Sequence, residues 1–553
     1  MAPRLLGTLA RSLESRWWLV ATVALATTLR AAHVLSLRET PWFDHLVVDP
    51  EYYDEWARRL AAGGWLGERP FYMDPLYPYF LGVIYRLCGR DLLLVRLVQV
   101  ALGAGSCALV AVIGRRVGGA AIGALAALGF ALYKPDIFYV AEVDKTCLSV
   151  FLTAAALALA LGPSLPARFA GGFTLGLAAL TRANFLLFAP LGILVFLMER
   201  SVPDARAFGL PRPVVAATLF AAGVGLSLLP VALRNHHLSG EWILTTSQAG
   251  QNFYIGNNPT NPWGAYGALP FVRGNPHFEE ADFRAAAEAQ AGRSLAPREV
   301  SRFWFAQAFQ HMREHPAFAA RAMFCKLVLF WNDFEISDNQ DQYLLERDSW
   351  VLRLPLLGFG GVAPLALLGV IATVRTRRAV RLLGGFVILY CASVVAFFIF
   401  SRYRIQVVPA LLPLAAVGAA ELVARIRDRS WTRVAAAAAV VAGAGLLCFH
   451  RFGIFSRDNE LVVEMRLRHL GEVYETAGMP DRAIDVFQEA VRGCPTRCPQ
   501  ALEKLFAAYV KTGRLADGEA YFRAFTRAHP GQPDGERDLQ RLMEIEAAGP
   551  GRR

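Results

Sequence analysis

Residues 91–113 read DLLLVRLVQVALGAGSCALVAVI and decide what kind of fold this chain adopts. A helix that crosses a bilayer needs about 20 mostly apolar residues, and this stretch has that length. Arg115 and Arg116 follow soon after, as is typical of a short loop on the cytoplasmic side of a membrane. The stretch therefore predicts a transmembrane α-helix.

Other stretches of this kind bring the prediction to about eleven spans, so we expect an all-α, polytopic transmembrane helical bundle. They lie at 17–35, 117–133, 146–161, 168–181, 184–198, 213–231, 352–374, 382–400, 405–424 and 432–450. Residues 75–88 are either a short span or a helix at the membrane interface, which leaves the count open. The composition agrees, because 55% of the residues are hydrophobic and only 19% are charged, whereas soluble domains have roughly 25% charged residues.

Arginines gather in the short loops 114–117, 375–381 and 425–433, which places these loops and the N-terminus in the cytoplasm. The outer side then receives three longer segments, 36–74, 134–145 and 234–350. An odd number of spans puts the C-terminal tail outside as well. We therefore expect a multi-pass protein of the bacterial inner membrane whose tail lies in the periplasm.

The net charge of +11 raises the question of nucleic-acid binding. Residues 451–553 hold 16 basic and 16 acidic residues, so the positive excess lies in the short loops of the membrane part. This distribution indicates membrane topology and excludes a nucleic-acid patch.

The tail repeats a pattern of small and large residues. One copy has Leu470, Gly471, Tyr474, Gly478, Ala483, Phe487, Ala490 and Pro495, and a second has Leu505, Phe506, Tyr509, Gly513, Gly518, Phe522, Phe525 and Pro530. The pattern resembles the tetratricopeptide repeat, in which two helices pack closely as a hairpin. The sequence thus predicts a membrane domain, 1–450, and a small helical-hairpin repeat domain, 451–553. Two repeats are few, so we expect them to lean on the membrane body, a partner or a second copy.

Two cysteines lie at the junction between these repeats. Cys494 and Cys498 are separated by a turn that Pro495 favours, so an oxidising periplasm would allow a disulfide between them. Two free thiols are the alternative if the tail is cytoplasmic.

The acidic loop after the first span is a candidate for chemistry. It contains Val48-Asp49-Pro50-Glu51-Tyr52-Tyr53-Asp54-Glu55, in which Pro50 is placed to open a helix. Asp49 is then either the N-cap of that helix or a general base that takes a proton from an acceptor hydroxyl or amine. The other acids of this helix share a face, for which plain solvation is the alternative.

Four arginines lie at the outer ends of spans: Arg182, Arg234, Arg402 and Arg404. Charges near lipid depth are costly and tend to be functional. A guanidinium also binds phosphate through paired hydrogen bonds. We expect these side chains to converge around one outward-facing cavity, with snorkelling at the interface as the alternative.

Segments found in order over residues 17–425 resemble the GT-C superfamily of membrane glycosyltransferases. The resemblance is to the branch with protein O-mannosyltransferases and bacterial lipid A aminoarabinose transferases. Besides the acidic loop, the segments are Pro75-Leu76-Tyr77-Pro78, Ala141-Glu142-Val143-Asp144-Lys145, Gly176-Leu177-Ala178-Ala179-Leu180-Thr181-Arg182, Arg234-Asn235, Gly256-Asn257-Asn258-Pro259 and Ser401-Arg402-Tyr403-Arg404. The family often has two adjacent acids in the first loop, whereas Pro50 follows Asp49 here. The second acidic role therefore stays open between Glu51 and Asp54.

The resemblance implies a glycosyltransferase that takes a sugar from a polyprenyl-phosphate donor on the outer face of the membrane, with Asp49 as general base. The substrate-binding residues that it implies are Glu142, Lys145, Arg182, Arg234, Asn257, Arg402 and Arg404. Glu142 either orients the acceptor or binds a divalent metal, although no cysteine or histidine spacing predicts a metal centre. The sugar stays open, as does the acceptor: protein, lipid A, cell-wall polymer or glycolipid.

Two other classes of function compete with this one. A transporter or lipid flippase would show internal repeats among the spans and charges in mid-membrane, and neither is clear here. A non-catalytic scaffold that presents the repeat domain would account for the tail but not for the acidic loop and the outer arginines. The repeat domain favours a protein partner or acceptor, since such repeats form concave binding surfaces.

Overall fold

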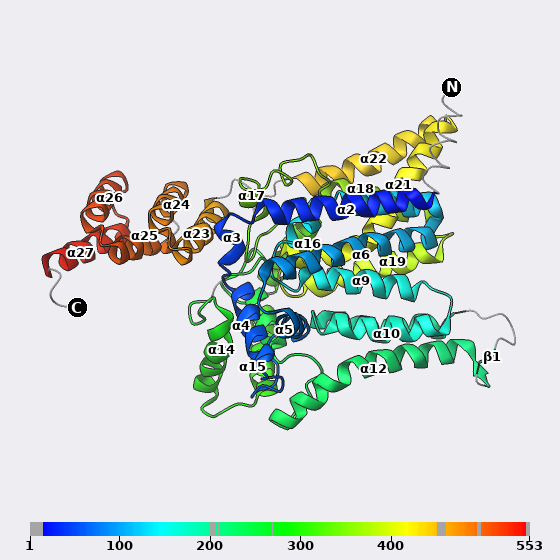
Figure 1. The fold of residues 1–553 in the computed structure, drawn as a ribbon, viewed down its shortest axis with the longest axis horizontal. Helices are drawn as coiled ribbons and strands as arrows, with labels where there is room; N and C mark the ends of the chain where they lie inside the picture. The colour runs from blue at the N-terminus through cyan, green and yellow to red at the C-terminus, as the bar shows by residue number, and fades with distance from the viewer. Residues whose placement is uncertain are drawn as a thin grey trace. The chain divides into compact units, whose positions relative to one another are not determined.

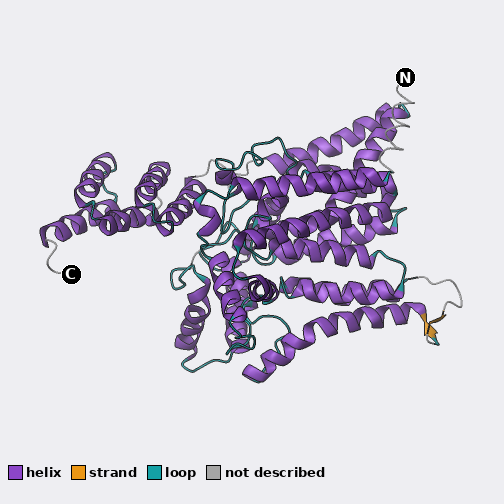
Figure 2. Ribbon diagram, viewed as in Figure 1, coloured by secondary structure: helices purple, strands orange, loops and turns teal. Residues whose placement is uncertain are grey.

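The computed structural model describes residues 15–199, 206–207, 209–267, 269–450, 460–494 and 499–548. Within them, regular structure is almost all helical, and the only sheet pairs β1 (Arg206–Ala207) with β2 (Leu210–Pro211) (Figure 2). The all-α class is therefore confirmed. The chain divides into two compact units, of which the first comprises Met1–Ser36, Val48–Asp338 and Ser349–His450. The second comprises Leu37–Val47, Asn339–Asp348 and Arg451–Arg553.

The first unit is a bundle of apolar helices. Six helical segments of the described chain are long and apolar enough to cross a membrane: α2 (Arg16–Ser36), α6 (Leu92–Gly118), α12 (Arg212–Ser239), α19 (Arg378–Val395), α20 to α21 (Ser401–Arg427) and α22 (Trp431–Phe449). Shorter helices occupy the other predicted spans: α7 (Ala120–Ala131), α9 (Thr146–Ala160), α10 (Leu165–Ala179), η1 with α11 (Ala183–Leu197) and α18 (Phe359–Thr373). The chain is thus a polytopic helical membrane protein, and eleven crossings stay a prediction.

Glycines let α10 and α12 approach closely, as small residues do in membrane helix pairs. A methyl group at Gly172 would overlap the backbone carbonyl of Phe220, and one at Gly176 would overlap the hydroxyl of Ser227. By contrast, a methyl group at Gly225 of α12 would meet nothing within 4 Å. A methyl group at Gly223 of α12 would overlap the carbonyl of Phe169, so glycines of both helices set the contact.

Loop helices gather at one end of the bundle (Figure 1). They are α4 (Asp49–Ala61), α5 (Leu76–Cys88), α14 (Pro276–Ala291) and α15 (Pro297–Glu314). The helix α5 has 13 residues, fewer than the about 20 that cross a bilayer, and it packs against α4. The short helix α8 (Lys134–Tyr139) is fixed by a buried ion pair between Arg30 of α2 and Asp136, 2.7 Å long.

Basic loops meet at the opposite end of the bundle. Arg377, just before α19, donates a hydrogen bond to the carbonyl of Val117 in the last turn of α6 at 2.9 Å. Two of the loops predicted to share the cytoplasmic side therefore do lie together.

The second unit is built from short helices joined by tight turns. They are α23 (Glu460–Thr476), α24 (Pro480–Gly493), α25 (Pro499–Thr512), α26 (Leu515–Ala528) and α27 (Pro533–Ala548). Gly471 lies against the ring of Phe487, and Gly518 against that of Tyr509, so small and large residues pair as the repeat pattern requires. The relation to tetratricopeptide repeats stays a prediction, and the proposed Cys494–Cys498 bridge involves Cys498, outside the described residues.

Two segments from the loops of the membrane domain belong to this second unit. The first contains α3 (Pro41–Asp44), which α23 contacts, and the second contains α17 (Gln342–Leu345). A buried ion pair joins Arg466 of α23 to Asp341, with 2.6 Å between Nε and Oδ2.

Candidate functional site

Asp49 is the first residue of α4 and does not cap it. The N-cap is Val48, and no side chain caps this helix. The capping alternative is therefore wrong, because Asp49 already belongs to the helix and its carboxylate turns to Arg402. Val48 has φ 58° and ψ −124°, a conformation that is rare for a β-branched residue. Such strain costs about 1–3 kcal/mol and tends to occur at functional sites.

Arg402, on α20 (Ser401–Arg404), is the centre of the site. Its Nη1 lies 2.6 Å from Asp49 Oδ2 and 3.3 Å from Asp144 Oδ2, and its Nη2 pairs with Asp338. The three carboxylates come from α4, from the loop before α9 and from the loop after α16 (Pro316–Trp331). Within the described residues, Asp49 Oδ1 accepts no hydrogen bond, so that oxygen can receive a proton.

Side chains of α5 and α6 fix the loop that carries Asp144. Gln99 donates from Nε2 to two backbone carbonyls of residues 140–142, at 2.8 and 2.7 Å. Arg96 donates from Nε to a third carbonyl of this stretch at 2.7 Å, and Tyr77 donates its hydroxyl to Gln99 Oε1 at 2.7 Å. The loop is thus held by backbone contacts, which leave its side chains for the site.

Arg182 and Arg402 meet at the ring of Tyr403. The Cζ atoms of Arg182 and Arg402 lie 4.7 and 5.5 Å from the ring centroid. Arg182 Nη2 donates to Thr146 Oγ1 at 3.3 Å, and its buried Nε has no partner among the described residues. Arg182 therefore brings a guanidinium with an unused donor to the cluster.

Lys145 and Glu142, also expected to bind substrate, lie in the same loop and differ in whether a partner compensates their charge. Lys145 pairs through Nζ with Asp74, so its charge is compensated locally. Glu142 is buried, and within the described chain its Oε1 has no partner. Burial raises the pKa of Glu142 well above its ordinary value, and the nearby charge of Asp144 adds to the shift. These effects favour the protonated acid, which can donate a hydrogen bond.

The carboxylates around Arg402 also influence one another. Burial raises the pKa of Asp338 to about 7; Arg402 opposes this shift, whereas Asp49 and Asp144 add to it. Asp338 therefore holds a proton more readily than an isolated aspartate does.

The structure places neither candidate for the second acidic role at this cluster. Asp54 is buried and forms ion pairs with Arg90 at 2.8 Å and Arg58 at 3.0 Å, and it accepts a hydrogen bond from Tyr85. These contacts tie α4 to α5. Glu51 is only partly buried and forms no ion pair among the described residues. The other acids at the cluster are Asp144 and Asp338.

Two of the four outer arginines lie elsewhere. Arg234 donates from Nε to the Leu66 carbonyl at 2.7 Å and lies over the ring of Phe71, so it holds the loop before α5. Arg404 is buried and pairs with Glu335, with 2.6 Å between Nη2 and Oε1. The expected convergence therefore holds for Arg182 and Arg402 only.

Asn257, also expected to bind substrate, is occupied by the protein itself. Its Nδ2 donates to the carbonyls of Phe253 and Ala396, at 2.8 and 2.9 Å, and its Oδ1 accepts from Lys326 at 2.8 Å. It anchors the end of α13 (Ala249–Gly256) instead of facing the cluster.

Sequence reasoning missed several members of the cluster. Asp144 and Tyr403 stand inside the motifs of the acidic loop before α9 and of α20, directly beside Lys145 and Arg402. Asp338 lies in the stretch 332–341, whose richness in acidic residues is the one signal that could have pointed to it. No spacing along the chain links it to Arg402, and only the fold brings them together.

The described residues contain no group of three or more His, Cys, Asp or Glu side chains arranged to hold a metal ion. The three carboxylates converge on a guanidinium, which supplies the positive charge at their centre. In the described part of the chain, the residues of this cluster therefore do not fit a resident metal.

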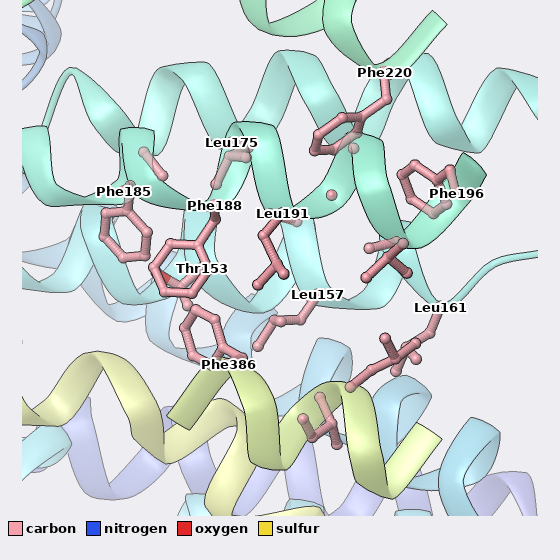
Figure 3. Close-up of a pocket in the computed structure, with 18 residues that line it drawn as sticks. Thr153, Leu157, Leu161, Leu175, Phe185, Phe188, Leu191, Phe196, Phe220 and Phe386 are labelled. Carbon is pink, nitrogen blue, oxygen red and sulfur yellow. The ribbon is translucent and has the colours of Figure 1, made fainter. Parts of the chain in front are cut away.

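An apolar cavity of about 110 Å³ lies among the helices of the bundle. Its lining comes from α9, α10, η1, α11, α12 and α19, and includes Thr153, Leu161, Leu175, Phe185, Phe188 and Phe196. Figure 3 shows Phe185 and Phe188 toward one end and Phe196 and Leu161 toward the other. Phe185 follows Arg182 by three residues, and Thr153 Oγ1 lies 3.3 Å from Gln406 Oε1, so the first end adjoins the cluster.

Comparisons with known proteins were made on sequence and on structure. No protein-family model matches the chain, and no curated protein matches it. Among solved structures, the chain is similar to an oligosaccharyltransferase from Archaeoglobus fulgidus in its apo form, with 13% identity and a TM-score of 0.42. That alignment covers 84% of this chain and 60% of the archaeal one, so the chain spans well under the full length of that enzyme.

The chain is also similar to ArnT from Cupriavidus metallidurans bound to undecaprenyl phosphate. The identity is 19%, the TM-score is 0.33, and the alignment covers 74% of this chain and 80% of that one. The archaeal oligosaccharyltransferase AglB in complex with an inhibitory peptide and a dolichol-phosphate aligns with 12% identity and a TM-score of 0.36, over 84% and 60% of the two chains. At these scores the similarity assigns no activity to this chain.

Proposed function

We infer that this protein is a GT-C-type glycosyltransferase that moves a sugar from a polyprenyl-phosphate carrier to an acceptor hydroxyl or amine. The observation that carries this proposal is one cluster in which Arg402 pairs with Asp49 through Oδ2 and shares the ring of Tyr403 with Arg182. The ordered motifs over residues 17–425 support it independently. The arginine bias of the loops at the other end favours an outer-face location for the site.

Asp49 acts as the general base in this proposal. Arg402 holds Asp49 through Oδ2, so Oδ1 points its remaining lone pairs at an acceptor. The acceptor oxygen or nitrogen gives its proton to Oδ1 and attacks the anomeric carbon, while the bond from that carbon to the phosphate oxygen breaks. The leaving lipid phosphate gains negative charge in the transition state, which a fixed cation stabilises.

Arg182 is the better candidate for that cation. Arg402 already faces three carboxylates, whereas Arg182 has no acidic partner in the described chain and keeps an unused Nε donor. We assign to Glu142, whose burial favours the protonated acid, the role of donating a hydrogen bond to the acceptor or the sugar. We assign the apolar cavity that Phe185 lines to the isoprenoid tail of the carrier, because its lining is almost entirely apolar.

A transfer assay tests the proposal. Wild-type and Asp49→Asn proteins are reconstituted in vesicles with a radiolabelled polyprenyl-phosphate sugar, and transfer to acceptor is counted. The amide has the same shape but cannot take the proton, so we expect a loss of about 10²–10⁴-fold, as for other general bases. Glu55→Gln, an acid on the same helix that does not touch Arg402, is the control and should retain activity. Full turnover by Asp49→Asn would overturn the assignment.

A further inference from the structure

The end of the bundle opposite the proposed transfer site has a recess of its own, with a volume of about 380 Å³. Arg116, Arg168, Arg377 and Arg378 line it, together with Glu199 and apolar side chains. Four positive charges therefore face one negative charge. A recess of this composition attracts an anion.

Glu199 compensates part of this charge. It lies 2.8 Å from Arg378 Nη1 and 3.3 Å from Arg168 Nη2. Arg168 also lies over the ring of Phe196, with Cζ 4.3 Å from the centroid, which keeps its guanidinium at the border of the apolar region. Each guanidinium has five N–H donors, so both retain donors beyond those used by Glu199.

The other two arginines are anchored at helix ends. Arg116 donates to the carbonyl of Ala158 near the end of α9, and Arg377 donates to that of Val117 at 2.9 Å. These contacts fix the two guanidinium groups at the mouth of the recess. Arginines whose role is only to set membrane topology do not have to line a recess. The arginines of the loop 425–433 are of this kind, because they line neither this recess nor the apolar cavity.

The recess continues into the apolar cavity. Ala160, Leu161, Phe196 and Leu382 line both. The helix α9 runs from Thr146, which contacts Arg182, to Ala160, and its 15 residues correspond to about 22 Å. The apolar path therefore runs from the end of the bundle that holds Arg182 toward the end that holds the basic recess.

We propose that this basic recess binds the phosphate headgroup of a lipid whose chain lies in the apolar cavity. The ligand is a lipid phosphate because the anion site and the apolar path are continuous, whereas a free phosphate would use only the arginines. A polyprenyl phosphate fits both parts, and the recess would hold it from the membrane face opposite the transfer site. The inference goes beyond the proposed reaction and does not depend on Asp49 being a base.

Two variants with opposite effects test the recess. Arg378→Gln removes one cation, and Glu199→Gln removes the one acid among the described residues that line the recess. The full-length protein in detergent is titrated with polyprenyl phosphate, and binding is measured by native mass spectrometry. We expect about tenfold weaker binding for the first variant, the usual scale for one charge-assisted hydrogen bond, and tighter binding for the second. Arg433→Gln, a surface arginine outside the recess, is the control and should bind as the wild type does.

Two further ligands test what the recess recognises. Equal binding of the uncharged polyprenol would show that only the tail is recognised, and equal competition by inorganic phosphate would show a free-anion site; either result overturns the proposal. Unchanged affinity in both variants overturns it as well. Tighter lipid binding by Glu199→Gln cannot result from misfolding. The proposal can therefore be tested even if Arg378→Gln folds poorly. Loss of transfer in Asp49→Asn is a separate result, because that residue lies at the other end of the bundle.

Discussion

Removing Arg402 should destabilise the membrane domain in a way that depends on pH. In the wild-type protein, Asp49 and Asp144 lie within 3.3 Å of Arg402 Nη1, and Asp338 pairs with Nη2. The variant Arg402→Gln leaves all three carboxylates without this shared cation. Taking one partner from a buried ion pair costs about 3–5 kcal/mol. We expect a loss of that size in the free energy of unfolding at pH 8.

Protons can replace the missing charge when the pH falls. The variant raises the carboxyl pKa values in the folded state, so the folded protein takes up protons that the unfolded chain does not bind. Between pH 8 and 5.5, each such proton recovers up to about 3 kcal/mol, at 1.36 kcal/mol per pH unit. The loss in Arg402→Gln should therefore shrink strongly at pH 5.5.

Denaturant titration in detergent micelles measures the free energy of unfolding at pH 8 and at pH 5.5. A second mutation makes the test more specific. Asp338→Asn should recover part of the stability of Arg402→Gln at pH 8, because it removes one of the three uncompensated charges. It should not rescue Arg404→Gln, a buried arginine two residues away whose partner is Glu335. A loss below about 1 kcal/mol at pH 8, or equal rescue of both variants, would show that the carboxylates do not depend on Arg402 as described.

Three further predictions concern packing, pH and topology. Gly172→Ala should lower the free energy of unfolding by about 1–3 kcal/mol, because its methyl overlaps the α12 backbone, whereas Gly225→Ala should be neutral or stabilising; equal effects in thermal melts would contradict the close contact. Because the pKa of Asp338 is raised to about 7, its protonated form stabilises the fold below pH 4, and this contribution is lost as the pH rises through 7. Asp338→Asn should therefore flatten the fall of melting temperature between pH 5 and 8. An impermeant thiol reagent should label Cys494 and Cys498 in intact cells only after reduction; labelling only in opened cells would place the tail inside.

The sequence by itself determined the class of fold. Apolar length predicts spans because unpaired backbone groups are too costly in lipid, so each long apolar stretch must be helical. The helices of the structure confirm this at every predicted span, from α2 to α22. Local sequence patterns predict the ends of helices less reliably. The pattern around Asp49 allowed it to be an N-cap, but the helix begins one residue earlier, at Asp49 itself.

Only the tertiary structure decided which charges share a site. Arg402 and Arg404 look alike in the sequence, yet one faces three carboxylates and the other pairs with Glu335, because successive residues of a helix point in different directions. Asp338 lies far along the chain from Asp49, and the return of the loop after α16 brings them to one guanidinium. The spacing of residues along a chain reveals local periodicity, but it does not reveal which distant loops come into contact. The members of the cluster are therefore determined by how the helices of the bundle pack.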